Sequence, residues 1–194
     1  LLNYMYSREN VNSNKTYKYW LRDIAVVETL FATGARVYEI SHIKLDCINL
    51  NTGLIKIMGK GGKERYIQVA APEILDILKK YYEYNSEAIK TSGFFFVNNR
   101  GNRYTEQSIR LMLKKYTNLA GIKRNITPHM FRHSFATYLI EEEVDVTYVQ
   151  QILGHSSIKT TQIYIHIAAK KQAEILREKH PRKLMNIVRM ARAA

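Results

Sequence analysis

The sequence is poor in cysteine, in proline and in long hydrophobic runs. Cys47 is the single cysteine among 194 residues, which excludes an internal disulfide framework and a zinc site rich in cysteine, and weakly favours a reducing compartment. No apolar run approaches the roughly 18 to 20 residues that a membrane-spanning helix needs, and runs such as Phe94–Val97 are strand-sized. Residues 1–4 read as the middle of a helix, with neither an initiating methionine nor a signal peptide, so we expect a fragment of a longer protein.

Negative charge is also scarce. The chain has 17 Asp and Glu residues against 30 Lys and Arg residues, a formal net charge of +13. This surplus favours a polyanionic partner, most often nucleic acid, because contacts with phosphates release condensed counterions. The alternative at this point is a solvated basic surface in an organism whose proteins are rich in Lys, Asn, Ile and Tyr. Hydrophobic residues make up 46% of the chain, enough for the core of one domain of ordinary size.

Apolar residues recur at helical spacing over most of the chain and change to a strand-like pattern once. The strand-like part predicts an antiparallel three-stranded sheet from Ile48–Asn51, Leu54–Met58 and Arg65–Val69. Ser7–Lys15 reads as a polar loop, and Phe94–Val97 as a short extended piece. Helices are expected over Tyr19–Thr33 and Ala35–Ile43, after Pro72, after the N-cap Thr105, after Thr127-Pro128, over Val146–Leu153 and from about Ile165. The fold class is therefore mainly α with a small antiparallel three-stranded β-sheet.

The segment Ile126–His133 predicts the start of a helix that carries basic groups. Thr127 suits the N-cap and Pro128 the first helical position, so His129 and Arg132 lie on one face at the positive end of the helix. Unpaired N–H groups there favour an anion, the guanidinium matches phosphate oxygens, and histidine exchanges a proton near neutral pH. The plainer interpretation of this segment alone is an exposed basic first turn.

A zinc site on the same helix is a weaker interpretation. His129 and His133 are four residues apart, as in zinc-binding helices. However, Met130 stands where a zinc protease needs glutamate, and the cation Arg132 would repel a metal ion. We therefore expect no metal at this segment.

Two further segments carry charged residues at short spacing. Gly59–Arg65 predicts a tight hairpin that presents Lys60 and Lys63, and it lacks the spacing and flanks of a phosphate-binding P-loop. Its lysines are either solvated turn residues or a mobile finger that reaches a groove as general acid or phosphate contact. Arg36 and Glu39, three apart on a helix, are an ordinary ion pair in the plainer interpretation.

The last segment combines a helix end with a histidine and a tyrosine. Leu153-Gly154-His155 reads as a helix C-terminus followed by His155, and Tyr164 comes nine residues later. One tyrosine among 14 is no signal alone. Each segment alone is a weak indication of function, whereas the order and spacing of all of them together are specific. Six positions form the series: Arg36, Lys60, His129, Arg132, His155 and Tyr164.

This series resembles the tyrosine recombinase (phage integrase) family. The matching patterns are Thr-Gly-x-Arg-x-x-Glu, a Gly-Lys-Gly hairpin, His-x-x-Arg-His, Leu-Gly-His and a Tyr nine residues beyond that last His. The likeness runs from about Leu1 to about Pro181, with no substitution at the six positions. It implies the catalytic-domain fold of that family, which is shared by DNA breaking-rejoining enzymes.

The resemblance also implies a reaction. Arg36 and Arg132 would clamp the non-bridging oxygens of one DNA phosphate. Tyr164 would attack phosphorus, forming a 3′-phosphotyrosyl enzyme and releasing a 5′-hydroxyl. Lys60 would give a proton to that leaving oxygen, and His129 would take the proton of the tyrosine.

Further residues receive supporting roles from the same resemblance. His155 would donate a hydrogen bond to the phosphate, Glu39 would orient a basic residue or a backbone group, and His133 would be structural. Lys63 and Arg65 would contact DNA phosphates. The bond energy would be kept in the protein–DNA link, so the resemblance implies no ATP or other cofactor. Basic groups would occupy the place where other phosphoryl-transfer enzymes hold a metal, so it implies no metal either.

The implied organisation is a catalytic domain over 1–167 and a basic helix or tail over 168–194, with the family's N-terminal DNA-clamping domain absent from this chain. The tail would dock on a neighbouring protomer, or lie on DNA or its own domain. The apolar residues available for docking are Ile175, Leu176, Leu184, Ile187 and Val188.

The implied partners are double-stranded DNA at a specific recombination site, a tetramer of the protein on that DNA and accessory DNA-bending proteins, without a membrane. The implied location is the cytoplasm, on the nucleoid, of a bacterium or as the product of a mobile element. Two other functions stay open: DNA relaxation like that of a type IB topoisomerase, and a catalytically inactive DNA-binding regulator of the same fold.

Overall fold

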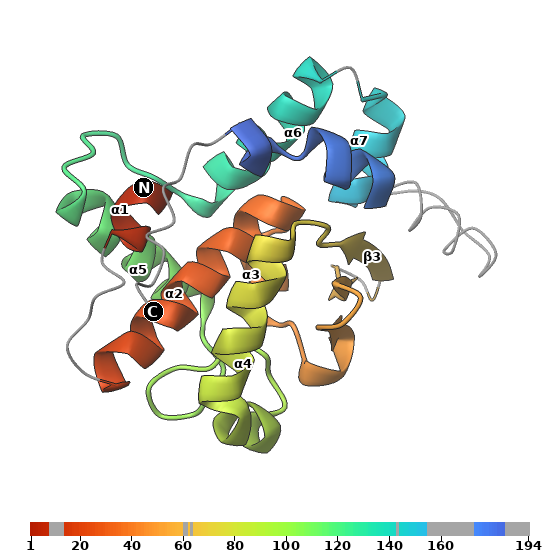
Figure 1. Cartoon of the computed structure of the whole chain (residues 1–194). Helices are drawn as coiled ribbons and strands as arrows, with labels where there is room; N and C mark the ends of the chain where they lie inside the picture. Colours follow the sequence, from red (N-terminus) through yellow and green to blue (C-terminus); the bar gives the residue numbers. More distant parts are fainter. Residues whose placement is uncertain (8–13, 60–61, 63, 143, 155–172, 185–194) are drawn as a thin grey trace, which may run out of the picture.

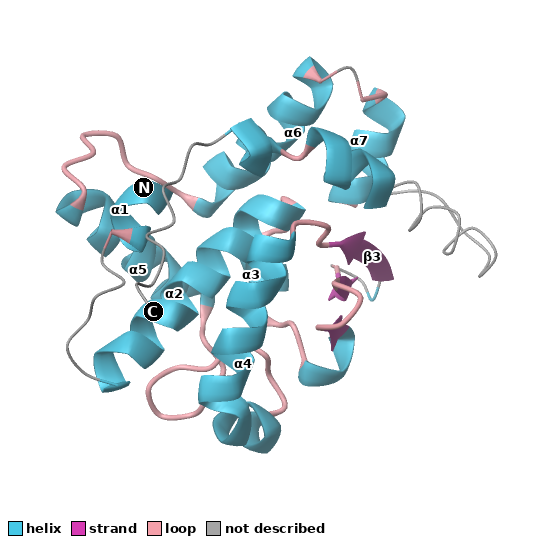
Figure 2. Ribbon diagram, viewed as in Figure 1, coloured by secondary structure: helices cyan, strands magenta, loops and turns pink. Residues whose placement is uncertain are grey.

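The computed structural model of the chain describes residues 1–7, 14–59, 62, 64–142, 144–154 and 173–184. These residues form a cluster of helices with one small sheet at its side (Figures 1 and 2). The α-helices are α1 (Leu2–Tyr6), α2 (Asn14–Thr33), α3 (Val37–Ser41), α4 (Pro72–Ser92), α5 (Glu106–Leu119), α6 (Pro128–Glu141) and α7 (Val146–Leu153), and residues 173–179 are also helical. The 3-10 turns are η1 (Leu45–Cys47) and η3 (Pro181–Leu184). The fold class predicted from the sequence is confirmed.

Helix α2 is the central element of the fold. It runs diagonally through Figure 1, and every residue from 20 to 35 is buried, as expected for a helix with neighbours on all sides. Helix α4 packs along it, and α6 crosses near its C-terminal end. Helix α2 begins at Asn14, five residues earlier than predicted, because Tyr17 is buried and stacks on Trp20 with ring centroids 5.3 Å apart. The core thus holds the N-terminal part of α2 as well as the rest of the helix.

The sheet places one basic side chain on its inner face. Its antiparallel strands β1 (Ile48–Asn49), β2 (Leu54–Met58) and β3 (Glu64–Gln68) lie in that order. Ile57 and Ile67 are fully buried, and the register pairs Ile57 with Arg65. Directly opposite residues share a face, so Arg65 points toward the core side of the sheet.

The described part of the C-terminal stretch packs on its own chain. The turn η3 contacts α2 and α6. Leu176 is buried in a cluster with Phe135 and Leu139, and Nε2 of the buried His180 lies 3.4 Å from the carbonyl oxygen of Ala32. Leu176 is therefore covered within the chain. Docking of residues 168–194 on a neighbouring protomer stays a prediction, and 168–172 and 185–194 lie outside the described residues.

Candidate active site

The site is built around the junction between α2 and α3. Gly34 ends α2 with a φ of +57°, and the extended Arg36 is the N-cap of α3, so the single helix expected over Ala35–Ile43 is reduced to α3. An oxygen of Glu39 accepts a hydrogen bond from the backbone N–H of Arg36 at 2.7 Å, and Nη1 of Arg36 reaches the other carboxylate oxygen at 3.2 Å. The Glu39 carboxylate is thus locked to the first turn of α3.

A second arginine binds the same carboxylate from the sheet. Nη1 and Nη2 of Arg65 donate to the two oxygens of Glu39 at 2.8 and 2.7 Å, and Nε donates to the carbonyl of Ile152 at 3.0 Å. Glu39 is only 2% exposed. Burial alone would raise the pKa of Glu39, but hydrogen bonds and charge from Arg65 and then Arg36 outweigh it, so that pKa is lowered.

The third arginine comes from α6. Nη1 of Arg132 donates to the carbonyl of Gly34 at 2.9 Å, and Nη2 donates to the carbonyl of Leu153 at 2.8 Å. Burial, with the charge of Arg36 next in size, lowers the pKa of Arg132 to about 10. Arg132 therefore remains a cation at neutral pH and lies close enough to Arg36 to sense its charge.

Together the described residues of the site place three guanidinium groups around one buried carboxylate. Arg36 is the most open of them, with 42% of its side chain exposed, whereas only 13% of the Arg65 side chain is exposed. Guanidinium groups held in place by backbone and carboxylate contacts need little reorganisation when an anion arrives. The arrangement suits a phosphate group.

Two glycines allow the elements around the site to approach closely. A Cβ on Gly34 would lie 2.7 Å from Cδ1 of Phe135 and 2.8 Å from Cδ2 of Leu153. A Cβ on Gly154, whose φ is +69°, would lie 2.9 Å from Cδ of Arg65. Side chains larger than glycine would push the ends of α2 and α7 away from their neighbours.

The structure describes some of the other predicted residues. Thr127 is the N-cap of α6 without a side-chain capping bond, and Pro128 is the first helical residue. His129 and His133 are exposed on this helix, on either side of the buried Arg132 in sequence. Four predicted site residues lie outside the described residues: Lys60, Lys63, His155 and Tyr164.

Metal-binding and membrane-spanning features are absent from the described residues. In the part of the chain that the structure describes, His, Cys, Asp and Glu side chains form no group of three able to hold a metal ion. None of the described helices combines the length and apolarity required to cross a membrane.

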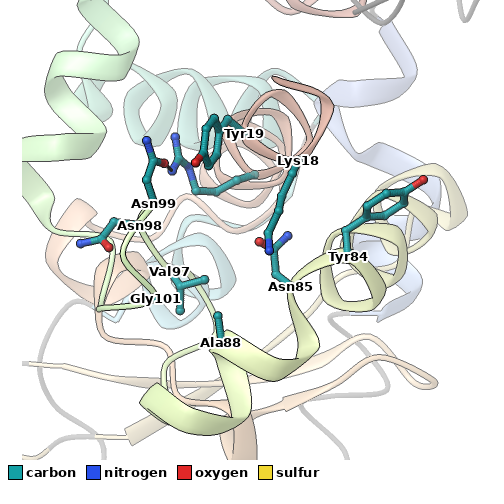
Figure 3. Close-up of a pocket in the computed structure, with 10 residues that line it drawn as sticks. Lys18, Tyr19, Tyr84, Asn85, Ala88, Val97, Asn98, Asn99 and Gly101 are labelled. Atoms are coloured by element: carbon teal, nitrogen blue, oxygen red, sulfur yellow. Dashed lines mark hydrogen bonds between the residues drawn. The ribbon is translucent and has the colours of Figure 1, made fainter. Parts of the chain in front are cut away.

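A hollow of about 410 Å³ lies elsewhere, between the N-terminal half of α2, the C-terminal half of α4 and the loop at Asn98 and Asn99 (Figure 3). Arg22 in its lining is already neutralised by Asp23 at 2.7 Å and held by Asn99 at 2.8 Å. Arg22 precedes the end of α2 by about three helical turns, so the hollow is separate from the arginine site.

Comparison with known proteins decides the family. The profile of the phage integrase family matches residues 6–171. This chain belongs to the phage integrase family.

Solved structures similar to this chain include those of two recombinases. The XerA recombinase structure superposes with a TM-score of 0.68 at 29% identity, over 93% of this chain and 63% of that one. The structure of XerH recombinase bound to palindromic difH substrate, a post-cleavage complex, has a TM-score of 0.67 at 28% identity, over 89% and 49%. A tyrosine recombinase of Agathobacter rectalis is 47% identical over 91% of this chain, which spans 58% of that relative. The chain thus spans about half of the length of such family members.

Within this family fold, sequence reasoning missed the observed surroundings of Arg65. We predicted a DNA-phosphate contact for Arg65, and the structure shows its guanidinium bonded to Glu39 and Ile152, which favours a different role. The sequence contains an indication of these surroundings. Residues two apart lie on the same face of a strand, and Arg65 is followed at that spacing by the apolar Ile67 and Val69. A charged residue in phase with buried ones indicates an internal partner.

Proposed function

We propose that this integrase-family protein is a site-specific DNA recombinase that cleaves and rejoins DNA by transesterification. The observation that carries the proposal is the buried Glu39 that fixes Arg36 and Arg65 beside Arg132, so that three guanidinium groups gather around one carboxylate among the described residues. In such a site a phosphate that gains charge in the transition state is stabilised by donors already in position.

In the proposed reaction, one phosphorus–oxygen bond forms as another breaks. The phenolic oxygen of Tyr164 attacks phosphorus while the bond to the 5′ oxygen breaks, and a 3′-phosphotyrosyl link results. His129 accepts the phenol proton, and Lys60 gives a proton to the departing 5′ oxygen. Arg36 and Arg132 bind the non-bridging oxygens. Attack by a 5′-hydroxyl of another strand reverses these steps and rejoins the DNA.

Further residues and regions complete the proposal. His155 donates to the phosphate, while Lys63 contacts the DNA backbone. Residues 1–167 act as the catalytic domain and 168–194 as a basic helix or tail. The reaction uses no metal ion or cofactor, and the protein acts as a tetramer in the cytoplasm, with accessory DNA-bending proteins as further partners.

Duplex DNA is the proposed substrate and partner. The XerH relative was solved on its difH substrate after cleavage, and this chain has a net charge of +13, which suits a polyphosphate backbone. The surplus charge supplies affinity for any duplex, so base contacts must supply the site preference.

A covalent-capture experiment tests the proposal. The protein at its full natural length is incubated with a pool of nicked duplexes whose recognition arms are randomised, and adducts are separated on a denaturing gel. We expect a covalent protein–DNA band that is unchanged in EDTA and absent in Tyr164→Phe. Tyr148→Phe is the matched control, because Tyr148 is an exposed tyrosine on α7, and it should retain the band.

The other outcomes are equally informative. A band that persists in Tyr164→Phe refutes the nucleophile, and one that EDTA abolishes refutes the metal-free reaction. DNA binding without any adduct would identify a regulator instead. Relaxation of supercoiled plasmid without dependence on a site would identify a topoisomerase-like enzyme.

A further inference from the structure

We propose that Arg65 is a positioning residue, which fixes the phosphate-binding arginines and the end of α7 relative to one another without touching the phosphate. This role rests on the proposed recombinase function and adds a residue whose observed contacts are all internal. The hydrogen bonds of Arg65 join β3, which carries it, to α3 and to α7. Three elements that are distant in sequence therefore meet at one guanidinium.

The sheet register turns Arg65 inward. Arg65 stands opposite the fully buried Ile57, and only 13% of its side chain is exposed. A contact with the DNA backbone would require the side chain to leave Glu39, and a carboxylate that is only 2% exposed would then lose two of its hydrogen bonds and keep those from Arg36. The internal position is therefore the stable one.

The contacts use the shape of the guanidinium. Nη1 and Nη2 engage both oxygens of Glu39, while Nε points to the carbonyl of Ile152. Lysine carries the same charge on a single nitrogen and has no planar fork, so it cannot hold both partners in this geometry. The position requires arginine for its shape as well as for its charge.

Arg65 also closes the end of α7. The last carbonyls of a helix have no partners within the helix and attract cations. Here the carbonyl of Ile152 accepts from Arg65 and that of Leu153 accepts from Arg132, which is itself bound to Gly34. The helix end is thereby tied to β3, to α6 and to the end of α2, immediately before the segment that leads toward Tyr164.

Removing Arg65 should disturb catalysis through its neighbours. Glu39 would keep only the partners on α3, and its unshared charge would draw Arg36 inward, away from the phosphate. The end of α7 would lose one of its two observed side-chain bonds. Misplacement by about 1 Å in an active site can cost about 100-fold in rate. We therefore expect a slower cleavage step with DNA affinity unchanged.

The test separates cleavage from binding. A nicked duplex recovered from the covalent-capture experiment is used in excess to measure the single-turnover rate of adduct formation, and its dissociation constant is measured at several salt concentrations. Arg65→Gln should lower the rate about 100-fold, with the dissociation constant and its salt slope unchanged. Arg65→Lys should restore less than a tenth of the lost rate, because the fork is missing.

A matched control accounts for the lost charge. Arg103 also donates to α3, with Nη1 3.1 Å from Oγ of Ser41, but this bond lies away from the Glu39 carboxylate. Arg103→Gln removes the same charge and should cleave at the wild-type rate. If Arg65→Gln does not fold, as judged by thermal unfolding, Arg65→Lys against the wild type decides the question.

A double-mutant cycle distinguishes positioning from direct contact. If Arg65 acts through Glu39, Glu39→Gln combined with Arg65→Gln should be no slower than the slower single variant. Multiplying rate losses together with a salt slope reduced by about one would mean that Arg65 binds a phosphate and would overturn the inference. Wild-type cleavage in Arg65→Gln would also overturn it. Absence of any adduct with the wild-type protein would refute the recombinase function instead.

Discussion

Gly34→Ala should destabilise the protein at the point where α2, α6 and α7 meet. The substitution forces a side chain into a residue with a φ of +57°, and its Cβ would lie 2.7 Å from Phe135 and 2.8 Å from Leu153. The left-handed conformation costs about 1 kcal/mol for alanine, and overpacking in a close-packed core costs about 1–3 kcal/mol more. The free energy of unfolding should therefore fall by about 2–4 kcal/mol.

Gly93→Ala separates the two contributions. Gly93 caps α4 with a φ of +73°, and a Cβ there meets nothing within 4 Å. The free energy of unfolding of Gly93→Ala should fall by about 1 kcal/mol, which is the conformational cost alone. Urea unfolding followed by circular dichroism measures both variants, and the difference between them isolates the steric cost at Gly34.

The same substitution should reach the active site. The carbonyl of Gly34 accepts a hydrogen bond from Arg132, so a shift of the chain there moves a proposed phosphate ligand. We expect Gly34→Ala to form adduct about 100-fold more slowly, at a temperature where it remains folded, and Gly93→Ala to match the wild type. Equal losses of stability in the two glycine variants would refute the close approach that we infer at Gly34.

Two further predictions concern stability. Burial, with a smaller contribution from Arg182, lowers the pKa of His180 to about 4 from 6.5, so the unfolded chain binds a proton that the folded chain does not. The contribution of His180 to the free energy of unfolding should be constant above pH 6.5 and fall by about 3 kcal/mol toward pH 4. When the free energy of unfolding is measured with urea at several pH values, His180→Gln should depend less on pH than the wild type. Thr105 caps α5 by accepting from the N–H of Ser108 at 3.2 Å, so Thr105→Ala should lower the free energy of unfolding by about 1 kcal/mol, whereas an unchanged urea midpoint would contradict the cap.

Much of the fold follows from local patterns. The strands that pair across the Asn51–Gly53 turn, the helix after Pro72 and the Thr105 cap are visible in the sequence, because turn residues, caps and apolar periods act within a few residues. The extended piece at Phe94–Val97 is present as two isolated bridges, Lys44 with Phe94 and Val97 with Arg103. The helix start at Asn14 was missed because tertiary burial of Tyr17 extends α2 beyond its apolar stripe.

The order and spacing of the motifs along the chain are enough to indicate the family, which the phage integrase profile confirms over residues 6–171. The +13 charge indicates a polyanionic partner, since a protein that binds a phosphate backbone needs a surplus of cations. Neither observation shows which guanidinium holds which partner.

That assignment depends on the tertiary structure. The bond from Arg132 to Gly34 joins residues 98 apart, and the bonds from Arg65 to Glu39 and to Ile152 join residues 26 and 87 apart. Such contacts depend on sheet register, on helix ends that meet and on glycines that let backbones approach, and none of these is set within a short stretch of chain. The sequence by itself determined the family and the surplus of basic groups, and the packing of α2, α6, α7 and β3 decided which arginine points outward and which is held inside.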